Sequence, residues 1–306
     1  MSRIVIALGG NAISAGDPSA LGQQKACLQS IAQLRPLLEN NEAVLTHGNG
    51  PQVGALLLQQ EAGNTAKTPA MPLATVGAMS QGSIGYWLEQ ASLNGKLAKP
   101  AVCLVTPTLV DRNDAAFANP TKPIGPFYKK EQVADLQKSH PDAVYKEDAG
   151  RGWRQVVASP KPVQIMNTDL IELLVEHGSV PIVAGGGGIP VVKDEAGNLH
   201  GVDAVIDKDW GAALLARTLH ADKLIILTAV DHAYINFGKP DQQALTRVSA
   251  DEIADYLAQG QFAQGSMAPK VEACLDFVRH TGKEAVIAAL SQAGQVEQGA
   301  GTTIYA

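Results

Sequence analysis

The sequence predicts an α/β protein with a three-layer αβα architecture, in which helices cover both faces of a mostly parallel central sheet. Short β-branched runs alternate with stretches of helical periodicity along most of the 306 residues, and such alternation is typical of parallel sheets. Three of the runs lead into glycine turns, at Gly9-Gly10-Asn11, at Gly48-Asn49-Gly50 and at residues 185–188. One long stretch, about residues 113–162, breaks the alternation. We therefore expect two lobes and an inserted, protruding subdomain.

The N-terminal part begins with strand, glycine turn and helix. Residues 3–8 are a β-branched run, and apolar residues recur at helical spacing between residues 20 and 40. The elements expected next are a strand at 44–47, helices at 53–60 and 76–91, and a strand at 101–106. Ligands of parallel sheets collect at the carboxyl ends of strands. Because the glycine turns follow such ends, we expect them to meet in one crevice and to lay unhindered N–H groups against a large anion.

The stretch of about residues 113–162 contains six prolines, clustered glycines and several lysines, with helical periodicity only around residues 131–137. A loop of this length inside a compact domain is usually functional. A floppy surface excursion is the alternative, but it would not need the aromatic residues Phe127, Tyr128 and Trp153. We interpret the stretch as a lid-like subdomain.

After residue 162 the alternation returns. The expected helices are 166–177, 210–220, 249–257 and 267–280, and the expected strands are 179–184, 202–206, 223–228, 285–290 and 302–305. Residues 194–198 are typical of the turn of a small hairpin. We place the boundary between an N-terminal lobe, residues 1–206, and a C-terminal lobe, residues 207–306, after the strand at 202–206.

Composition excludes several classes of protein. The formal net charge is -6 and no run of four Lys or Arg occurs, which argues against a nucleic-acid partner. No apolar stretch approaches the roughly 20 residues that span a bilayer, so no membrane partner is expected. Cys27, Cys103 and Cys274 are far apart and have no zinc-site spacing. With no signal segment before the first strand, these features predict a cytoplasmic protein with reduced thiols.

Neither standard nucleotide signature is present. The sequence has no GxxxxGK[ST], the first glycine turn fails the GxGxxG spacing, and the second strand ends in His47 rather than an acidic residue. His47 is interpreted as a structural residue at a strand end. Several glycine turns above one sheet suit a phosphoryl group that passes between two ligands better than one long dinucleotide.

Three lysines are candidates for binding that phosphoryl group. Lys208 lies between Asp207 and Asp209 where a helix begins, so an aspartate can cap the helix while the carboxylates hold the ammonium in place. Lys122 lies in a proline-rich run that limits its movement, and Lys270 follows Pro269 early in the last long helix. Each lysine alone is equally consistent with a solvated surface residue.

Together, several long motifs resemble the carbamate kinases, within the amino acid kinase superfamily. They are found in this order at residues 7–12, 47–54, 81–87, 119–127, 147–154, 185–190, 205–209, 265–270 and 301–304. The resemblance implies reversible phosphoryl transfer between ATP and carbamate, usually run from carbamoyl phosphate and ADP toward ATP, with Mg²⁺ and in a homodimer. It also implies that the N-terminal lobe binds carbamate or carbamoyl phosphate and the C-terminal lobe binds the nucleotide.

The resemblance also assigns roles to individual residues. It implies phosphate binding by Gly9, Gly10, Asn11, Gly48, Asn49 and Gly50, and catalysis by Lys122, Lys208 and Lys270 with Asp209 as the lysine-orienting aspartate. The implied nucleotide contacts are Gly185, Gly186, Thr228, Asp231, Tyr234, Met267 and Lys270. Many members of the superfamily have a lysine where this chain, like the carbamate kinases, has Ala7. The subdomain with Lys122 supplies the missing cation.

The chemistry implied by the resemblance requires few protein groups. A carbamate oxygen is anionic near neutral pH and needs no general base. Mg²⁺ can be held by phosphates and water, so no protein metal site is expected. Two alternatives stay open. The fold could transfer the phosphoryl group to another carboxylate or to UMP, or it could serve as a non-catalytic sensor of nucleotide or carbamoyl phosphate, although a sensor would not need all three lysines.

Overall fold

A computed structural model describes residues 1–14, 16–148 and 150–306, without the side chains of Asn11 and Ser139. At its centre is an eight-stranded sheet with the strand order β15-β17-β16-β12-β1-β2-β9-β3. The strands are β1 (Arg3–Leu8), β2 (Glu42–His47), β3 (Ala101–Cys103), β9 (Val180–Ile182), β12 (Lys223–Thr228), β15 (Arg247–Ser249), β16 (Glu284–Ala289) and β17 (Thr302–Tyr305). Strand β17 runs antiparallel to β16, and the other neighbours in this sheet run parallel. The predicted mostly parallel sheet is confirmed.

Helices cover both faces of this sheet, because its strands are apolar on both faces. Ile4, Ile6 and Leu8 of β1 pack with α2 (Ala20–Asn40) and α4 (Leu73–Asn94), whereas Val5 and Ala7 belong to the cluster on the opposite face. That second cluster contains the helices α6 (Thr168–Glu176), α7 (Lys208–Thr218), α8 (Ala250–Ala258) and α9 (Ala268–Thr281). Alternate residues of a strand point to opposite faces, so the three layers follow from the sequence.

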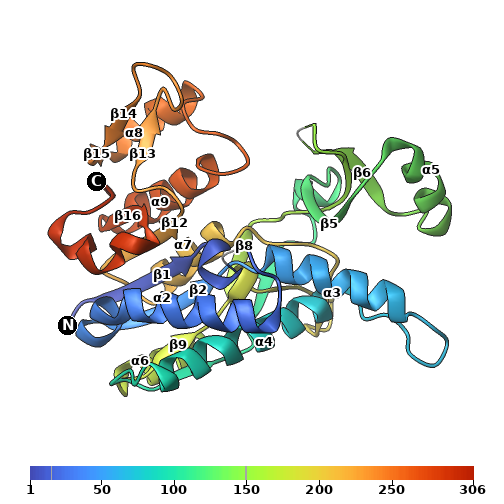
Figure 1. Cartoon of the computed structure of the whole chain (residues 1–306), viewed down its shortest axis with the longest axis horizontal. Helices are drawn as coiled ribbons and strands as arrows, with labels where there is room; N and C mark the ends of the chain where they lie inside the picture. Colours follow the sequence, from blue (N-terminus) through green and yellow to red (C-terminus); the bar gives the residue numbers. More distant parts are fainter. Residues whose placement is uncertain (15, 149) are drawn as a thin grey trace.

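The inserted stretch leaves and re-enters the body through a second sheet. This four-stranded sheet has the order β11-β10-β4-β8, with β4 (Pro107–Val110), β8 (Pro162–Ile165), β10 (Ile189–Lys193) and β11 (Leu199–Gly201). Between β4 and β8 the chain forms β5 (Lys122–Tyr128), α5 (Lys130–Ser139), β6 (Val144–Glu147) and β7 (Trp153–Val157). The three strands make an antiparallel sheet of their own. Figure 1 shows this subdomain, drawn in green, projecting from the body.

Shorter elements complete the described chain. They are α1 (Asn11–Ser14), α3 (Gly50–Gly63), the hairpin of β13 (Ala233–Ile235) and β14 (Gln243–Leu245), and the 3₁₀ segments η1 (Ala115–Phe117), η2 (Gly185–Gly187) and η3 (Leu290–Gln298). The predicted hairpin turn at 194–198 is confirmed, since β10 and β11 pair antiparallel around it. No helix of the described chain is both long and apolar enough to cross a membrane.

The strand expected at residues 202–206 is wrong. Only Ala204 makes a bridge, to Ala158, and the residues around it are irregular. The apolar side chains are buried all the same, because Ile206 packs with Val110 and Val192. The expected lobe boundary after residue 206 stays a prediction. The eight-stranded sheet is continuous across it and takes β1, β2, β3 and β9 from one side and the other four strands from the other.

Candidate active site

The glycine turns meet at one edge of the central sheet. Strands β1, β2 and β9 are consecutive in the sheet and run parallel, so the turns that follow them lie side by side. A Cβ on Gly48 would come within 3.8 Å of the Gly10 nitrogen. A Cβ on Gly186 would come within 2.2 Å of the Asn49 side chain. The crevice expected from the sequence therefore exists, with the turns at residues 9–10, 48–50 and 185–188 along it.

The expected row of free amides is wrong at several of these glycines. The Gly9 N–H donates to Leu227 O and the Gly48 N–H to Leu8 O, both at 3.0 Å, so they extend the sheet. The Gly187 and Gly188 N–H groups close turns inside residues 184–188. Buried backbone groups are nearly always paired. Here the N–H groups donate to carbonyl oxygens of the protein, so they are not free to bind an anion.

The four consecutive glycines serve close packing. Gly185 lies under His47, since a Cβ there would come within 2.3 Å of the imidazole ring. Gly186 has φ +68° and faces Asn49, and Gly187 has φ +90° and lies against Ile206. Any side chain would clash and would also be strained at these φ values. The turn can thus bring β9 close to the residues that follow β2.

Two lysines share one buried aspartate beside these turns. Lys208 Nζ lies 2.5 Å from Asp209 Oδ1, and Lys270 Nζ lies 2.9 Å from Asp209 Oδ2. The Asp209 side chain is only 4% exposed. The stem of Lys208 passes over the second glycine turn, because a Cβ on Gly48 would lie 3.1 Å from Lys208 Cδ. Helix α7 supplies Lys208 and Asp209, and helix α9 supplies Lys270.

The charges in this cluster affect one another. Burial raises the pKa of Asp209, but the Lys208 and Lys270 ammonium groups outweigh it and leave that pKa below its ordinary value. Burial lowers the pKa of Lys208, and Lys270 lowers it too, while the Asp209 carboxylate opposes the shift. The Asp209 carboxylate thus opposes the loss of charge on Lys208 in a place that favours neutral groups.

The third lysine reaches the site from the subdomain. Lys122, at the start of β5, lies with its Nζ 2.7 Å from Asp207 Oδ2. The other oxygen of Asp207 accepts the Asp209 N–H at 2.9 Å, which makes Asp207 the N-cap of α7. Sequence reasoning interpreted Asp207 as a possible cap of α7 and, with Asp209, as a carboxylate that holds Lys208. It missed the contact of Asp207 with Lys122, because 85 residues separate the two.

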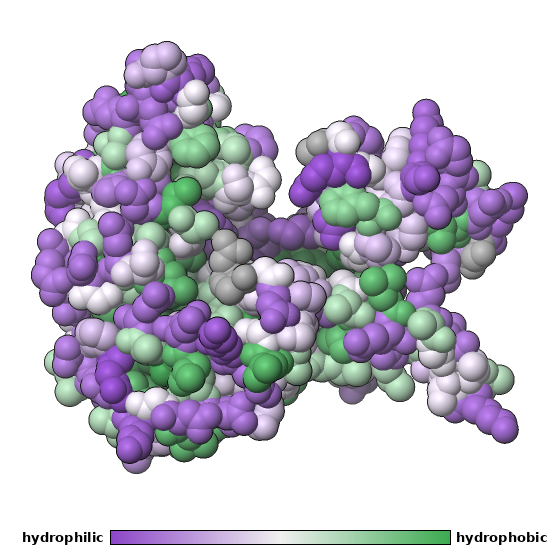
Figure 2. All heavy atoms as spheres, viewed as in Figure 1, coloured by the Kyte–Doolittle hydropathy of each residue, from purple (hydrophilic) through white to green (hydrophobic). Residues whose placement is uncertain are grey.

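A cavity of about 760 Å³ brings most of the predicted residues together. Its lining includes Gly9, Gly10, Gly48, Asn49, Gly50, Gly186, Lys122, Lys208, Asp209, Thr228 and Lys270. Figure 2 shows that the molecule is hollowed between the C-terminal elements and the subdomain, the parts that contribute Lys270 and Lys122. Sequence reasoning missed Ser291 in this lining. Ser291 follows the carboxyl end of β16, which lies two strands from β1 in the sheet. Its position after a predicted strand was the sequence signal that could have identified it.

Four predicted nucleotide contacts lie outside this lining, and one predicted phosphate contact is described only in part. Gly185 is buried beneath His47, and Met267 precedes α9 and packs against the core. The Tyr234 hydroxyl donates to Asp231 Oδ1 at 2.6 Å in the segment after β12. Asn11 begins α1, but its side chain is outside the described part of the chain. The roles of these residues stay predictions.

A second hollow of about 470 Å³ continues from the first toward the subdomain. Asn49, Gly50, Lys122 and Gly186 line both. Arg151 and Arg154 also line the second hollow, and each guanidinium lies 5.1 Å from the centre of the Phe127 ring. This hollow is therefore positively charged on the side of the subdomain.

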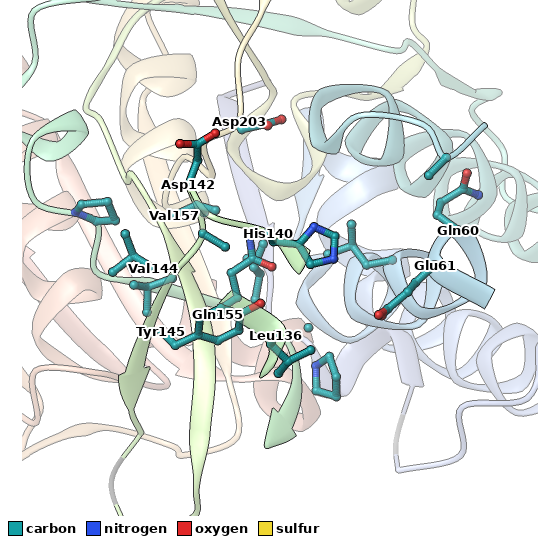
Figure 3. Close-up of a pocket in the computed structure, with 18 of the residues that line it drawn as sticks. Gln60, Glu61, Leu136, His140, Asp142, Val144, Tyr145, Gln155, Val157 and Asp203 are labelled. Carbon is teal, nitrogen blue, oxygen red and sulfur yellow. The ribbon is translucent and has the colours of Figure 1, made fainter. Parts of the chain in front are cut away.

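A third hollow, of about 580 Å³, separates α3 from the subdomain and has the opposite charge. Figure 3 shows Glu61 on α3 opposite Leu136, His140 and Tyr145 of the subdomain. Glu61, Asp142 and Asp203 are in its lining, and no lysine or arginine is among the described residues there. Anionic phosphates are attracted by cations, so the cavity with the three lysines is the candidate active site.

His47 is poorly suited to act as an acid or base near neutral pH. It is fully enclosed, and desolvation lowers its pKa to about 4. Its Nδ1 lies 3.0 Å from Gly48 O, so a neutral imidazole can donate there. These properties support the structural role expected from the sequence.

A protein-held metal is not indicated. No group of three or more His, Cys, Asp or Glu side chains in the described chain is arranged to bind one. Both oxygens of Asp209 accept from lysines, and Asp207 is engaged by Lys122 and the Asp209 N–H.

Comparison with known proteins agrees with this geometry. The model of the amino acid kinase family matches residues 2–289. The carbamate kinase of Lentilactobacillus hilgardii is 51% identical, over 99% of this chain and 96% of its own length, and that of Oenococcus oeni is 49% identical, over 99% and 98%. Among solved structures, carbamate kinase from Giardia lamblia bound to AMP-PNP superimposes with a TM-score of 0.92 and 44% identity, over 99% of this chain and 98% of that one.

Proposed function

This chain belongs to the carbamate kinases of the amino acid kinase family, and on that premise we propose how its residues divide the reaction between them. The activity is phosphoryl transfer between ATP and carbamate. It takes precedence over the two alternatives considered from the sequence, a different acceptor and a non-catalytic sensor. The observation that supports our assignment of roles is the convergence of three ammonium groups on one cavity.

Lys122, Lys208 and Lys270 neutralise the charge on the transferring phosphoryl group. In the transition state the transferring phosphoryl group carries negative charge on its oxygens. Fixed cations stabilise this charge most in a site that excludes most of the water. Asp209 holds Lys208 and Lys270 from opposite oxygens, so their spacing is set before a ligand enters. No side chain needs to remove a proton, because the attacking oxygen of carbamate or of ADP is already anionic.

The two substrates enter from opposite sides of the lysines. The nucleotide lies over Gly9, Thr228 and Lys270, with its adenosine toward the segment that contains Asp231, Tyr234 and Met267. Carbamate or carbamoyl phosphate lies toward Asn49, Gly50 and Lys122, where the positively charged second hollow opens. Gly10, Asn11, Gly48, Gly185 and Gly186 shape the floor between the two.

A Mg²⁺ ion brought with the nucleotide would be held by its phosphates and by water, because the carboxylates of Asp207 and Asp209 are already engaged by lysines. Bound there, the ion would neutralise further phosphate charge. The reaction runs toward ATP, because carbamoyl phosphate is a mixed anhydride and gives up its phosphoryl group more readily than ATP does.

The chain forms a homodimer through the open edge of the central sheet. Strand β3 is the last strand on that side, and an uncovered edge is a site for pairing. Exposed apolar side chains flank it on α4, on α6 and after β3, among them Tyr86, Leu93, Val105, Leu170 and Leu173. An apolar surface of this kind fits a second copy of the chain. The free cysteines are consistent with the proposed cytoplasmic location.

ATP synthesis by the purified chain tests this assignment. We expect ATP to form from ADP, Mg²⁺ and carbamoyl phosphate, and we expect Lys208→Ala to lower kcat by roughly 100-fold or more while keeping the wild-type melting temperature. Exposed Lys25 on α2 provides the matched control, since Lys25→Ala should retain full activity. A folded Lys208→Ala variant that turns over at the wild-type rate would disprove the role of this lysine.

A further inference from the structure

Asp207 is the one described residue that contacts both the subdomain lysine and the first turn of α7. Its Oδ2 accepts from Lys122 Nζ at 2.7 Å, and its Oδ1 accepts from the Asp209 N–H at 2.9 Å. Asp209 in turn holds Lys208 and Lys270. The two oxygens of Asp207 thus connect the protruding part of the chain to the residues that hold the other two ammonium groups.

The contact with Lys122 has an energetic consequence for that lysine. A long, flexible lysine side chain loses conformational entropy when it is fixed. Lys122 keeps 35% of its side chain exposed, so packing alone does not fix it. Ion pairing to Asp207, itself only 19% exposed, fixes the ammonium group before a ligand arrives. Binding of the anion therefore does not include the entropic cost of ordering this side chain.

Asp207 can hold the Lys122 ammonium group and still leave some of its N–H donors free to bind a ligand. An ammonium group has three N–H donors, and one of them reaches Asp207. The other two stay available for phosphate or carbamoyl oxygens in the cavity that Lys122 lines. Lys208 and Lys270 have the same arrangement with Asp209, so each of the three lysines is held by a carboxylate beneath it.

We propose that Asp207 is a positioning residue for carbamoyl phosphate, acting through Lys122 to hold the ammonium of the subdomain over the cavity. The inference rests on the proposed role of Lys122 and extends it to Asp207, which lines the same cavity. The competing explanation is that Asp207 only caps α7. The two tasks use different oxygens, and this makes them separable by substitution.

Asp207→Asn separates the two tasks. Asparagine keeps an oxygen that can accept the Asp209 N–H and is an equally good N-cap, but its amide NH₂ cannot accept from Lys122. Asp207→Ser is the second variant, because serine also caps well and is too short to reach Lys122. One folded variant is sufficient for the test, and thermal melting shows which of the two variants folds.

The measurement is steady-state kinetics in the direction of ATP synthesis with each substrate varied in turn. In both variants we expect the KM for carbamoyl phosphate to rise about tenfold, the KM for ADP to stay within twofold, and the melting temperature to match the wild type. The proposal would be overturned if the KM values for carbamoyl phosphate and ADP both stayed at their wild-type values. It would also be overturned if the two KM values rose equally, because equal changes indicate that α7 has shifted.

Lys122→Ala distinguishes failure of this inference from failure of the proposed function. We expect it to raise the KM for carbamoyl phosphate at least as much as Asp207→Asn does. If Lys122→Ala behaves as the wild type, the role proposed for Lys122 is wrong and the inference falls with it. If Lys122→Ala is impaired and both Asp207 variants are not, only the inference is overturned.

Discussion

Lys208 Nζ lies 2.5 Å from Asp209 Oδ1 although the two residues are neighbours in the chain. Their contact is possible because both lie in the first turn of α7, just after its N-cap. The backbone of one helix therefore fixes their relative position. Lys122 and Lys270 come from other elements, so this pair is the fixed reference around which the rest of the site is assembled.

The Asp209→Asn substitution should move the alkaline limit of activity to lower pH. The Asp209 carboxylate opposes the burial that lowers the pKa of Lys208, so without it that pKa falls further below the ordinary value of 10.5. The reaction needs the charged lysine, and the variant should lose activity at a pH where the wild type is still active. The profile of kcat/KM against pH measures this limit.

A matched control is available at another paired aspartate. Asp276 on α9 binds Arg217 on α7 at 2.8 Å, with 17% of the Asp276 side chain exposed, and it does not line the cavity. Asp276→Asn should leave the pH profile in place. An Asp209→Asn profile that coincides with the wild type, or that moves to higher pH, would contradict the assigned charge relationship.

Gly186→Ala should impair catalysis far more than an equivalent change elsewhere. Gly186 has φ +68°, and a Cβ there would come within 2.2 Å of the Asn49 side chain, so Asn49 must leave its place in the cavity. Misplacement by about 1 Å can cost roughly 100-fold in rate, which is the loss of kcat/KM we expect. Gly197→Ala is the control, since Gly197 has φ +87° with open space around it. Similar kinetic losses in both variants would show that backbone strain alone is responsible.

His47→Asn should make stability less sensitive to acid. The pKa of His47 is about 4 in the folded chain, against an ordinary value of 6.5, so between these values the unfolded chain binds more protons. The stability contributed by the neutral imidazole is therefore complete above pH 6.5 and is lost as the pH falls toward 4. From pH 7 to pH 5 the wild type should lose about 2 kcal/mol more than the variant. Urea unfolding at both pH values measures the difference, and equal losses would refute it.

Leu173→Asp should convert the proposed dimer to a monomer. Leu173 is 50% exposed on α6, beside the edge of the sheet, and a buried, unpaired carboxylate is costly in an apolar interface. Leu21→Asp is the control, because Leu21 is 76% exposed on α2 and should not affect assembly. Light scattering gives the mass in solution. A wild type with the mass of one chain would rule out the dimer.

The three layers could be predicted because the relevant signal is local. Strand β1 is apolar at every buried position from Ile4 to Leu8, which is typical of a strand covered on both faces. The same reasoning failed at residues 202–206, where an apolar run is buried without pairing as a strand. Burial requires apolar side chains in either conformation, so the composition of a short run does not distinguish them.

The site could be predicted in part, and the missing part depends on distant partners. The glycine turns were visible as sequence motifs, but the acceptor of the Gly9 N–H is on β12, more than 200 residues away. A separation of 85 residues likewise hid the contact of Lys122 with Asp207. Local sequence indicates which groups can take part in a site, and the fold decides which of them already have a partner.

The two ends of the subdomain lie next to each other, since Val110 of β4 is in register with Pro162 of β8. The stretch between these ends is nevertheless attached to the body at a second place, because Ile124 and Val157 pack with Val53, Leu73 and Val76. Exchange of the subdomain between relatives would carry Lys122 with it, and it would have to preserve this apolar contact to keep the ammonium group over the cavity.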